Sequence, residues 1–188
     1  MDARRARSHA CLVSELEAHA HWFTEPDPSS GARCLTLTLL ADHGNAARVA
    51  RDQAAEFLRG VGAGGVVDDA RLIVSELVGN VVNHVVPERS LARPGGSRRV
   101  DVHVKAWPKW LFIGVADEDA SPPLLPLGDT FWPGLREERA EAVVPESGRG
   151  LLIVQRVAAA VWWTPEDRGG KTVWCRLDLG SETQGPPS

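Results

Sequence analysis

The chain has 188 residues, of which 43% are hydrophobic and 24% are charged, so we expect one globular domain with a sizeable core. Its net charge of −4 disfavours direct binding to nucleic acid, and its three scattered cysteines disfavour a disulfide framework or a zinc site and fit a reducing compartment. No apolar run has the length of a membrane span and no signal-peptide pattern opens the chain, which predicts a cytoplasmic protein that does not bind membranes.

Composition divides the chain into a leader, a folded domain and a tail. Residues 1–32 end in a turn-rich Pro, Ser and Gly segment, and we expect them to form a leader outside the core, with its flexibility left open. The folded domain is expected over residues 33–180. Residues 181–188 are polar and rich in proline, and we expect a disordered tail.

The first predicted elements are a strand and two helices. Alternation of Thr and Leu predicts a strand at Cys34–Leu40. Apolar residues at helical spacing predict a helix at Asn45–Leu58. We expect the second helix to be capped by Asp68 or Asp69 and to end at Pro87.

A hairpin and a long connection follow. Val100–Ala106 alternates and Leu111–Ala116 is continuously apolar, which predicts two antiparallel strands with a short turn between them. Residues 118–147 contain five prolines and no long periodic element. A compact domain seldom keeps so long a connection unless the segment is a lid or is disordered.

The last predicted elements are a helix at Leu151–Val161 and a pair of strands at Val161–Thr164 and Thr172–Leu179. The order of all elements predicts an α+β fold, built as a two-layer α/β sandwich. Its sheet is expected to be mixed but mostly antiparallel, with the helices packed on one face.

The second predicted helix carries an unusual polar stripe. At 100° per residue, Glu76, Asn80, Asn83 and His84 share one face, opposite an apolar face. Asn and His are weak helix formers, and a carboxylate one turn before a carboxamide suits a hydrated Mg²⁺, which takes oxygen ligands. A partly exposed polar face on a core helix is an equally good interpretation of the stripe taken alone.

Two further segments are candidate ligand contacts. Gly148-Arg-Gly150 precedes a helix, where glycine permits close backbone approach and the helix start favours phosphate oxygens. An ordinary turn into a helix is the alternative, and Ile153 excludes a dinucleotide fingerprint. Asp117, at a strand end, is a candidate acceptor for a ligand amine, although a solvated carboxylate is the simpler interpretation.

The segment Gly170-Lys-Thr172 is not a phosphate-binding P-loop. That motif requires a glycine where Pro165 stands and a helix afterwards, whereas a strand is predicted here. A hairpin turn is the simplest interpretation, and a contact from Thr172 to a base or ribose is the alternative.

In order and spacing, these motifs resemble those of GHKL-type ATPases, and in particular the bacterial anti-sigma regulatory factors, which are serine-kinase-like ATP-binding proteins. The resemblance spans about residues 33–180 and implies the GHKL ATPase fold with an ATP lid. It is carried by Ser75–Asn80 with Asn83-His84 (N box), Val115–Asp117 (start of the G1 box), Ser147–Val154 (G2 box) and Gly169–Trp174 (closing strand).

The resemblance implies a role for each candidate residue. Glu76 would be the catalytic general base that activates a hydroxyl or water, and Asn80 would bind the Mg²⁺ that bridges the phosphates. Asp117 would accept a hydrogen bond from the adenine amine. The remaining ATP contacts would come from Asn83, from Gly148 and Gly150 with the amides of Arg149 and Leu151, and from Thr172 beside the adenine.

The implied function is an anti-sigma factor with ATP and Mg²⁺ as cofactors. It would sequester a sigma factor and act as a serine/threonine protein kinase on a STAS-type anti-anti-sigma partner, with a homodimer left open. However, Asp119 and Ser121 stand where the wider superfamily carries glycine. A non-catalytic module that binds nucleotide weakly and acts through its partners is therefore the alternative.

Overall fold

The computed structural model describes residues 31–42, 44–84, 98–127, 149–167 and 169–180. Nearly all of the predicted leader, the predicted tail, Pro87, Gly148 and most of the predicted lid lie outside the described residues. The domain boundaries proposed from the sequence therefore stay predictions.

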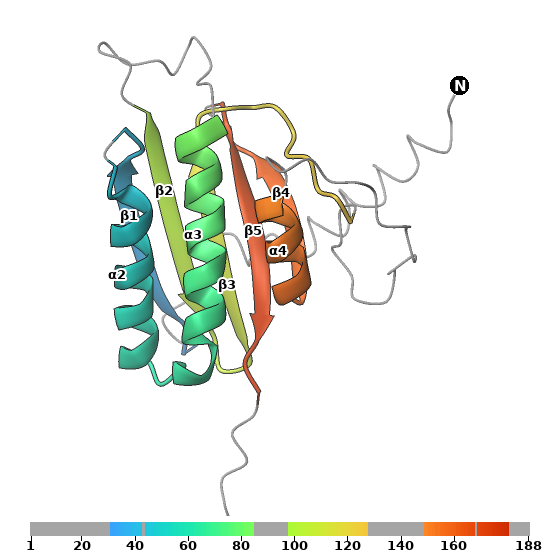
Figure 1. The fold of residues 1–188 in the computed structure, drawn as a ribbon. Helices are drawn as coiled ribbons and strands as arrows, with labels where there is room; N and C mark the ends of the chain where they lie inside the picture. The colour runs from blue at the N-terminus through green and yellow to red at the C-terminus, as the bar shows by residue number, and fades with distance from the viewer. Residues whose placement is uncertain (1–30, 43, 85–97, 128–148, 168, 181–188) are drawn as a thin grey trace, which may run out of the picture.

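A five-stranded sheet forms one layer of the domain (Figure 1). Its spatial order is β1 (Arg33–Leu40), β2 (Arg99–Ala106), β3 (Trp110–Asp117), β5 (Lys171–Asp178) and β4 (Ala160–Pro165). All four pairings between these strands are antiparallel. Each strand lies within one residue of its predicted bounds, because alternation and short turns mark strands clearly.

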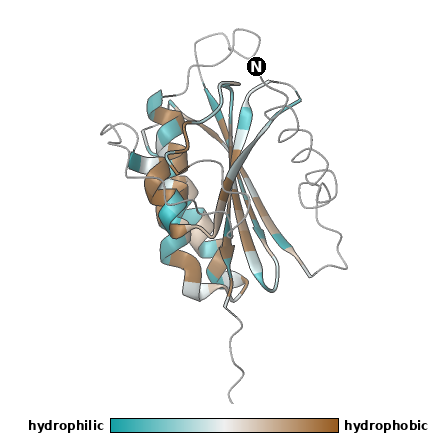
Figure 2. Cartoon of the chain, turned by 90° about the vertical axis from the view of Figure 1, so that its right-hand side faces the viewer, coloured by the Kyte–Doolittle hydropathy of each residue, from teal (hydrophilic) through white to brown (hydrophobic). Residues whose placement is uncertain are grey.

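The helices form the second layer and cover one face of the sheet (Figure 2). They are α2 (Ala46–Gly60), a short 3-10 turn η3 (Gly64–Val66), α3 (Val67–His84) and α4 (Arg149–Val157). This arrangement confirms the predicted α+β sandwich. Among the described helices, none is long and apolar enough to cross a membrane.

The main core lies between the two layers. From α3 it takes Ile73, Val74, Leu77, Val78 and Val81, all of which are buried. The strands contribute every second residue, because successive side chains point to opposite faces; these include Val100, Val102, Val104, Leu111, Ile113, Val115, Val173, Cys175 and Leu177. Each fully buried Val or Leu contributes about 1.5–3 kcal/mol, so the position of α3 on the sheet is strongly determined.

A second cluster occupies the other face of the sheet. Phe112, Trp162 and Trp174 are buried there, and the rings of Trp162 and Trp174 stack with centroids 6.5 Å apart. Gly114 lies directly across from Trp174 in the β3–β5 register. A methyl group on Gly114 would lie 2.5 Å from the Trp174 ring, so the absence of a side chain at this position makes room for the indole.

Two sequence predictions about helix ends were wrong. Asp68 and Asp69 do not cap α3, because η3 runs directly into a helix that begins at Val67, which places both carboxylates in the first turn. In the first turn their negative charges still interact favourably with the helix dipole. The helix predicted to reach Val161 ends at Val157, and the amide of Ala159 already bonds to Arg176 in the sheet. An apolar run alone does not show where a helix ends and a buried strand begins.

We predict that Gly114→Ala lowers the free energy of unfolding by about 1–3 kcal/mol, because the new methyl group overpacks the Trp174 ring. Urea unfolding measures the change. The matched control is Gly79→Ala in α3, where an added methyl group meets nothing within 4 Å. Since Ala favours a helix over Gly by about 1 kcal/mol, the control is expected to stabilise; equal effects from both variants would contradict the prediction.

Candidate functional site

The start of α4 packs against the polar stripe of α3. A methyl group placed on Gly150 would lie 2.8 Å from Glu76 Oε2 and 3.3 Å from Asn80 Oδ1. Gly150 is not among the described glycines with positive φ, so space rather than backbone conformation requires glycine here. The structure thus brings Glu76, Asn80 and Gly150 together from segments 70 residues apart in the chain, while Gly148 lies outside the described residues.

A cavity of about 280 Å³ opens beside this contact. It lies between α3, the end of β3, the start of β5, the start of α4 and the segment that follows β3. Its volume lies just below the range of about 300–1,000 Å³ that is usual for small-molecule sites. Polar groups of the lining come from Asn80, His84, Asp117, Asp119, Ser121 and Lys171, and apolar ones from Leu77, Val81, Val115, Pro122, Pro123, Leu124, Leu151 and Val173.

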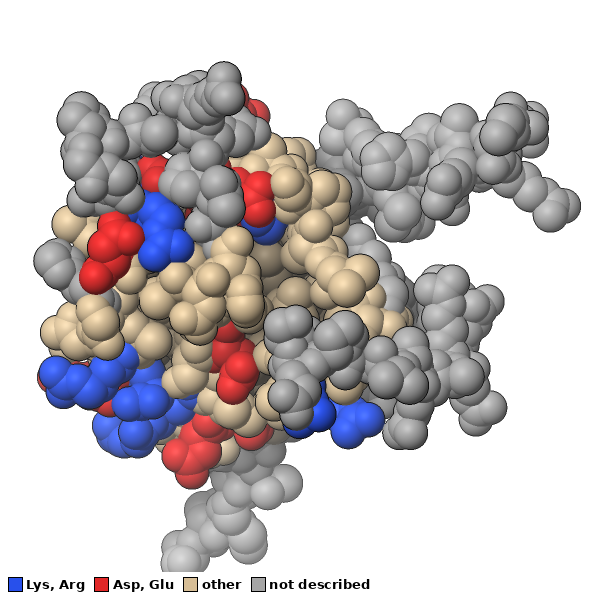
Figure 3. All heavy atoms as spheres, turned by 45° about the horizontal axis from the view of Figure 1, so that its top comes forward, with Lys and Arg blue, Asp and Glu red and all other residues tan. Residues whose placement is uncertain are grey.

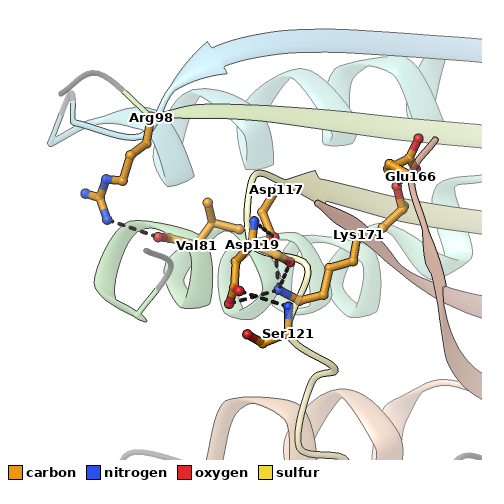
Figure 4. A network of polar contacts seen from close by, with 8 residues as sticks. Val81, Arg98, Asp117, Asp119, Ser121, Glu166 and Lys171 are labelled. Carbon is orange, nitrogen blue, oxygen red and sulfur yellow. Dashed lines mark hydrogen bonds and ion pairs between the residues drawn. The ribbon is translucent and has the colours of Figure 1, made fainter. Parts of the chain in front are cut away.

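The floor of the cavity holds a buried ion pair (Figure 4). Asp117 ends β3 and faces Lys171, its partner in the β3–β5 register. Lys171 Nζ donates to Asp117 Oδ1 at 2.9 Å and to the Asp119 carbonyl at 2.8 Å. The Asp119 amide also donates to Asp117 Oδ1, at 2.9 Å. β3 and β5 are therefore joined at the site by a charge-assisted network.

Burial raises the pKa of Asp117 above its ordinary value, while the hydrogen bonds and charge of Lys171 act in the opposite direction. For Asp119, burial also acts to raise the pKa, but hydrogen bonds from Ser121 together with Lys171 outweigh it, and the pKa is lowered. The two carboxylates differ because Asp117 is more deeply buried than Asp119.

The segment after Asp117 is tethered to the elements around it. The Glu118 carboxylate accepts a hydrogen bond from the Arg99 amide at 3.0 Å, and the Asp119 carboxylate accepts one from the Ser121 amide at 2.9 Å. Further along, the Leu127 amide donates to Gln155 Oε1 on α4, also at 3.0 Å. These contacts hold residues 118–127 as one wall of the cavity.

Gly170 brings the β4–β5 turn against the end of β3. Its φ is +87°, a conformation that favours glycine. A methyl group on Gly170 would also overlap the backbone oxygen of Asp117. The turn therefore needs glycine for two reasons, and it positions Lys171 at the first pairing of β5 with β3.

Five of the described candidate residues are not part of the cavity lining: Glu76 and Gly150, which lie together beside the cavity, and Asn83, Arg149 and Thr172. Thr172 lies on the opposite face of β5, almost fully buried, where its hydroxyl donates to Glu166. Asn83 and Arg149 are exposed and are not part of the cavity lining. By contrast, Leu151 lines the cavity beside Asn80 and Asp117.

Lys171 is the site residue that the sequence analysis missed. The last strand was predicted to start at Thr172, which assigned Lys171 to the turn. A signal was available, since Val173, Cys175 and Leu177 share the core face of this strand. Extending the same alternation back by one pair places Lys171 on the core face and Thr172 on the other.

No group of three His, Cys, Asp or Glu side chains within the described residues could hold a metal ion. A Mg²⁺ site here would therefore depend on the Asn80 carboxamide together with ligand oxygens and water, since this ion usually keeps several waters and takes few protein ligands.

A larger cavity of about 830 Å³ lies at the opposite end of the sheet. It is lined by residues such as Gly62, Trp107 and Leu179, from the turn after α2, the β2–β3 turn and the end of β5. None of the predicted site residues lies there. The smaller cavity is the better candidate for a ligand site, because polar side chains from α3, β3, the segment after β3 and β5 all line it.

Residues 65–181 match the family described as histidine kinase-, DNA gyrase B-, and HSP90-like ATPase. The chain belongs to this family. The match contains α3, the Asp117 strand end, α4 and the β4–β5 hairpin, which are the elements that build the cavity. No curated protein matches the chain at a significant level. The GHKL ATPase domain implies ATP binding, usually with Mg²⁺.

The site end of this ATPase domain has no uniform charge. Figure 3 views the molecule with this end turned forward and shows both acidic and basic side chains, with several basic ones gathered at the lower left.

We predict that Gly150→Ala lowers the affinity of the domain for MgATP by about tenfold or more, because the methyl group displaces Glu76 and Asn80 or shifts the start of α4. Isothermal calorimetry measures the affinity. Unfolding stability should change little, since the clashing atoms are the ends of side chains. Gly64→Ala is the control, as nothing lies within 4 Å of its added methyl group; unchanged ATP binding by Gly150→Ala would contradict the prediction.

Proposed function

We propose that this protein is a cytoplasmic, ATP- and Mg²⁺-dependent anti-sigma regulatory factor. It sequesters a sigma factor and phosphorylates a serine on a STAS-type anti-anti-sigma partner. The observation that carries the proposal is the contact of Glu76 and Asn80 with Gly150 beside the Asp117 cavity. An ordinary polar helix face would not need a glycine pressed against it.

The residues present fit a purine nucleotide. Gly150 leaves the space that a side chain would fill, and the first turn of α4 offers backbone N–H groups to phosphate oxygens. Asn80 supplies a hard oxygen ligand for Mg²⁺. Apolar walls such as Val115 and Val173, with the Asp117 carboxylate at the floor, suit a flat ring that carries an amine.

In this proposal the protein contributes positioning and proton transfer. When bound, MgATP supplies the transferable phosphoryl group and the cation that neutralises its charge. Glu76 accepts the proton of the attacking serine hydroxyl, as a general base must lie within hydrogen-bond reach of its substrate. Asn80 and the amides at the start of α4 hold the phosphate end of the nucleotide, while Asp117 orients the adenine ring. Catalysis then depends on orientation and electrostatics.

The finer assignment to the anti-sigma group is supported by two segments. The Gly169–Trp174 hairpin resembles the closing strand of these regulators, and its Gly-Gly turn positions Lys171 at the cavity. Ser121-Pro-Pro123, in place of the wider superfamily's second G1 glycine, resembles what short anti-sigma relatives carry, and it forms part of the cavity wall.

A second candidate is a non-catalytic module that binds nucleotide weakly and acts through partners alone. The observation that favours it is the tethering of residues 118–127. Lys171 binds the Asp119 carbonyl, and Gln155 binds the Leu127 amide. A wall held in this way has less freedom to move during a catalytic cycle than a glycine-rich segment.

We predict that Asn80→Ala weakens MgATP binding by about tenfold or more while ATP without Mg²⁺ is affected less, because the lost carboxamide oxygen serves the metal. Calorimetry with and without Mg²⁺ separates the two effects. Gln53→Ala on an exposed position of α2 is the matched carboxamide control. If wild-type protein gives no heat with MgATP, or if Asn80→Ala binds it normally, the nucleotide site is wrongly assigned.

We predict that Glu76→Gln retains MgATP binding but lowers phosphate transfer to a STAS partner by about 100-fold or more, because the amide cannot accept the serine proton. Transfer of labelled phosphate from ATP measures the rate. Glu56→Gln, on the exposed face of α2, is the control. Full transfer by Glu76→Gln would exclude its catalytic role, and no transfer by the wild type to any STAS partner would favour the non-catalytic module.

A further inference from the structure

Lys171 places a buried ammonium group in the wall of the cavity. Its side chain is only 6% exposed. Nζ lies 2.9 Å from Asp117 Oδ1, 2.8 Å from the Asp119 carbonyl oxygen and 3.4 Å from Asp119 Oδ2. An ammonium group has three N–H donors, so these three oxygens can use all of them. Lys171 therefore uses its N–H donors within the protein and has none left for a ligand.

One of the two carboxylate oxygens of Asp117 already accepts hydrogen bonds from the protein. Oδ1 accepts hydrogen bonds from Lys171 Nζ and from the Asp119 amide, each at 2.9 Å. A carboxylate oxygen has about two acceptor positions, so Oδ1 is filled. Within the described residues, no hydrogen bond reaches Asp117 Oδ2. A ligand in the cavity therefore meets a carboxylate with one available oxygen.

We propose that Lys171 is a positioning residue that sets the base specificity of the pocket: by holding Asp117 Oδ1, it leaves a single acceptor and selects a purine that needs only one. Adenine offers one exocyclic amine. Guanine offers its N1–H and 2-amino group side by side, a pair that is matched by both oxygens of one carboxylate. This inference rests on the nucleotide binding proposed above.

Lys171 also keeps Asp117 able to accept a hydrogen bond. Burial raises the pKa of Asp117, and the nearby Asp119 charge adds to this, whereas Lys171 opposes both. His84 is the remaining titratable group in the cavity lining. Without Lys171 the pKa of Asp117 would rise further, so a fall in pH would protonate the carboxylate sooner and weaken its bond to a ligand amine.

The wild-type protein provides the first test. Calorimetry at pH 7.5 compares the Mg²⁺ complexes of ATP, GTP and ITP; ITP keeps the N1–H of guanine but lacks the 2-amino group. We expect ATP to bind most tightly and GTP to bind within about twofold of ITP, because the second donor of guanine finds Oδ1 filled. A hydrogen bond to a charged group is worth about tenfold or more, so GTP binding tenfold tighter than ITP overturns the proposal.

Lys171→Met provides the second test, with Lys109→Met in the exposed β2–β3 turn as the matched control. We expect Lys171→Met to lose about tenfold in ATP affinity at pH 7.5 and more at pH 6, and to bind GTP more tightly relative to ITP, since Oδ1 regains an acceptor position. The control should match the wild type. Equal or tighter ATP binding by folded Lys171→Met, checked by thermal melting, overturns the proposal.

The two series separate this inference from the proposed function. If Lys171→Met does not fold, the comparison of GTP with ITP on the wild type still decides the point. If the wild type binds none of the three nucleotides, both the assignment of the nucleotide site and the proposed role of Lys171 are wrong. If ATP binds and depends on Asn80, but the GTP, ITP and Lys171→Met results differ from those expected, only the role of Lys171 is wrong.

Discussion

The antiparallel register between β3 and β5 is the constraint on which the site depends. It sets Asp117, at the end of β3, opposite Lys171, at the start of β5, with both side chains on the face that the helices cover. A slip of one residue would turn Asp117 to the other face, where Phe112 and Trp174 lie. The register is specified twice, by the alternating core residues of β5 and by the space at Gly114 for Trp174.

The second determinant of the site is the contact between α3 and α4. Apolar packing of α3 on the sheet fixes the direction of its polar stripe, and Gly150 lets the start of α4 approach Glu76 and Asn80. Asn80, which lies next to Gly150, and Asp117 then line the same cavity. This geometry fits a ligand with a charged end and a flat, amine-bearing end, as expected for a family of ATPases.

Much of this arrangement could be predicted from local patterns. Alternation marked the strands, and helical spacing showed that Glu76 and Asn80 share a face turned away from the core. Their position beside Gly150 agrees with the resemblance that suggested it. Thr172 was assigned to the adenine by the resemblance, although the alternation of Val173, Cys175 and Leu177 places it on the opposite face of β5. Lys171 was missed because the strand was predicted to start one residue too late, which left Lys171 in the turn. The end of α4 was predicted wrongly because an apolar run fits a helix or a buried strand equally well, and the start of α3 was predicted wrongly because the η3 turn leads directly into it.

The sequence by itself determined the α+β class, the positions of the strands and the polar stripe of α3, because these follow from spacing along a single segment. The tertiary structure alone decided that Lys171 neutralises Asp117, that Gln155 anchors Leu127 and that Gly150 is required by space. Each of these contacts joins residues that are distant in the chain. Their geometry depends on how whole elements pack, and local periodicity carries no information about that.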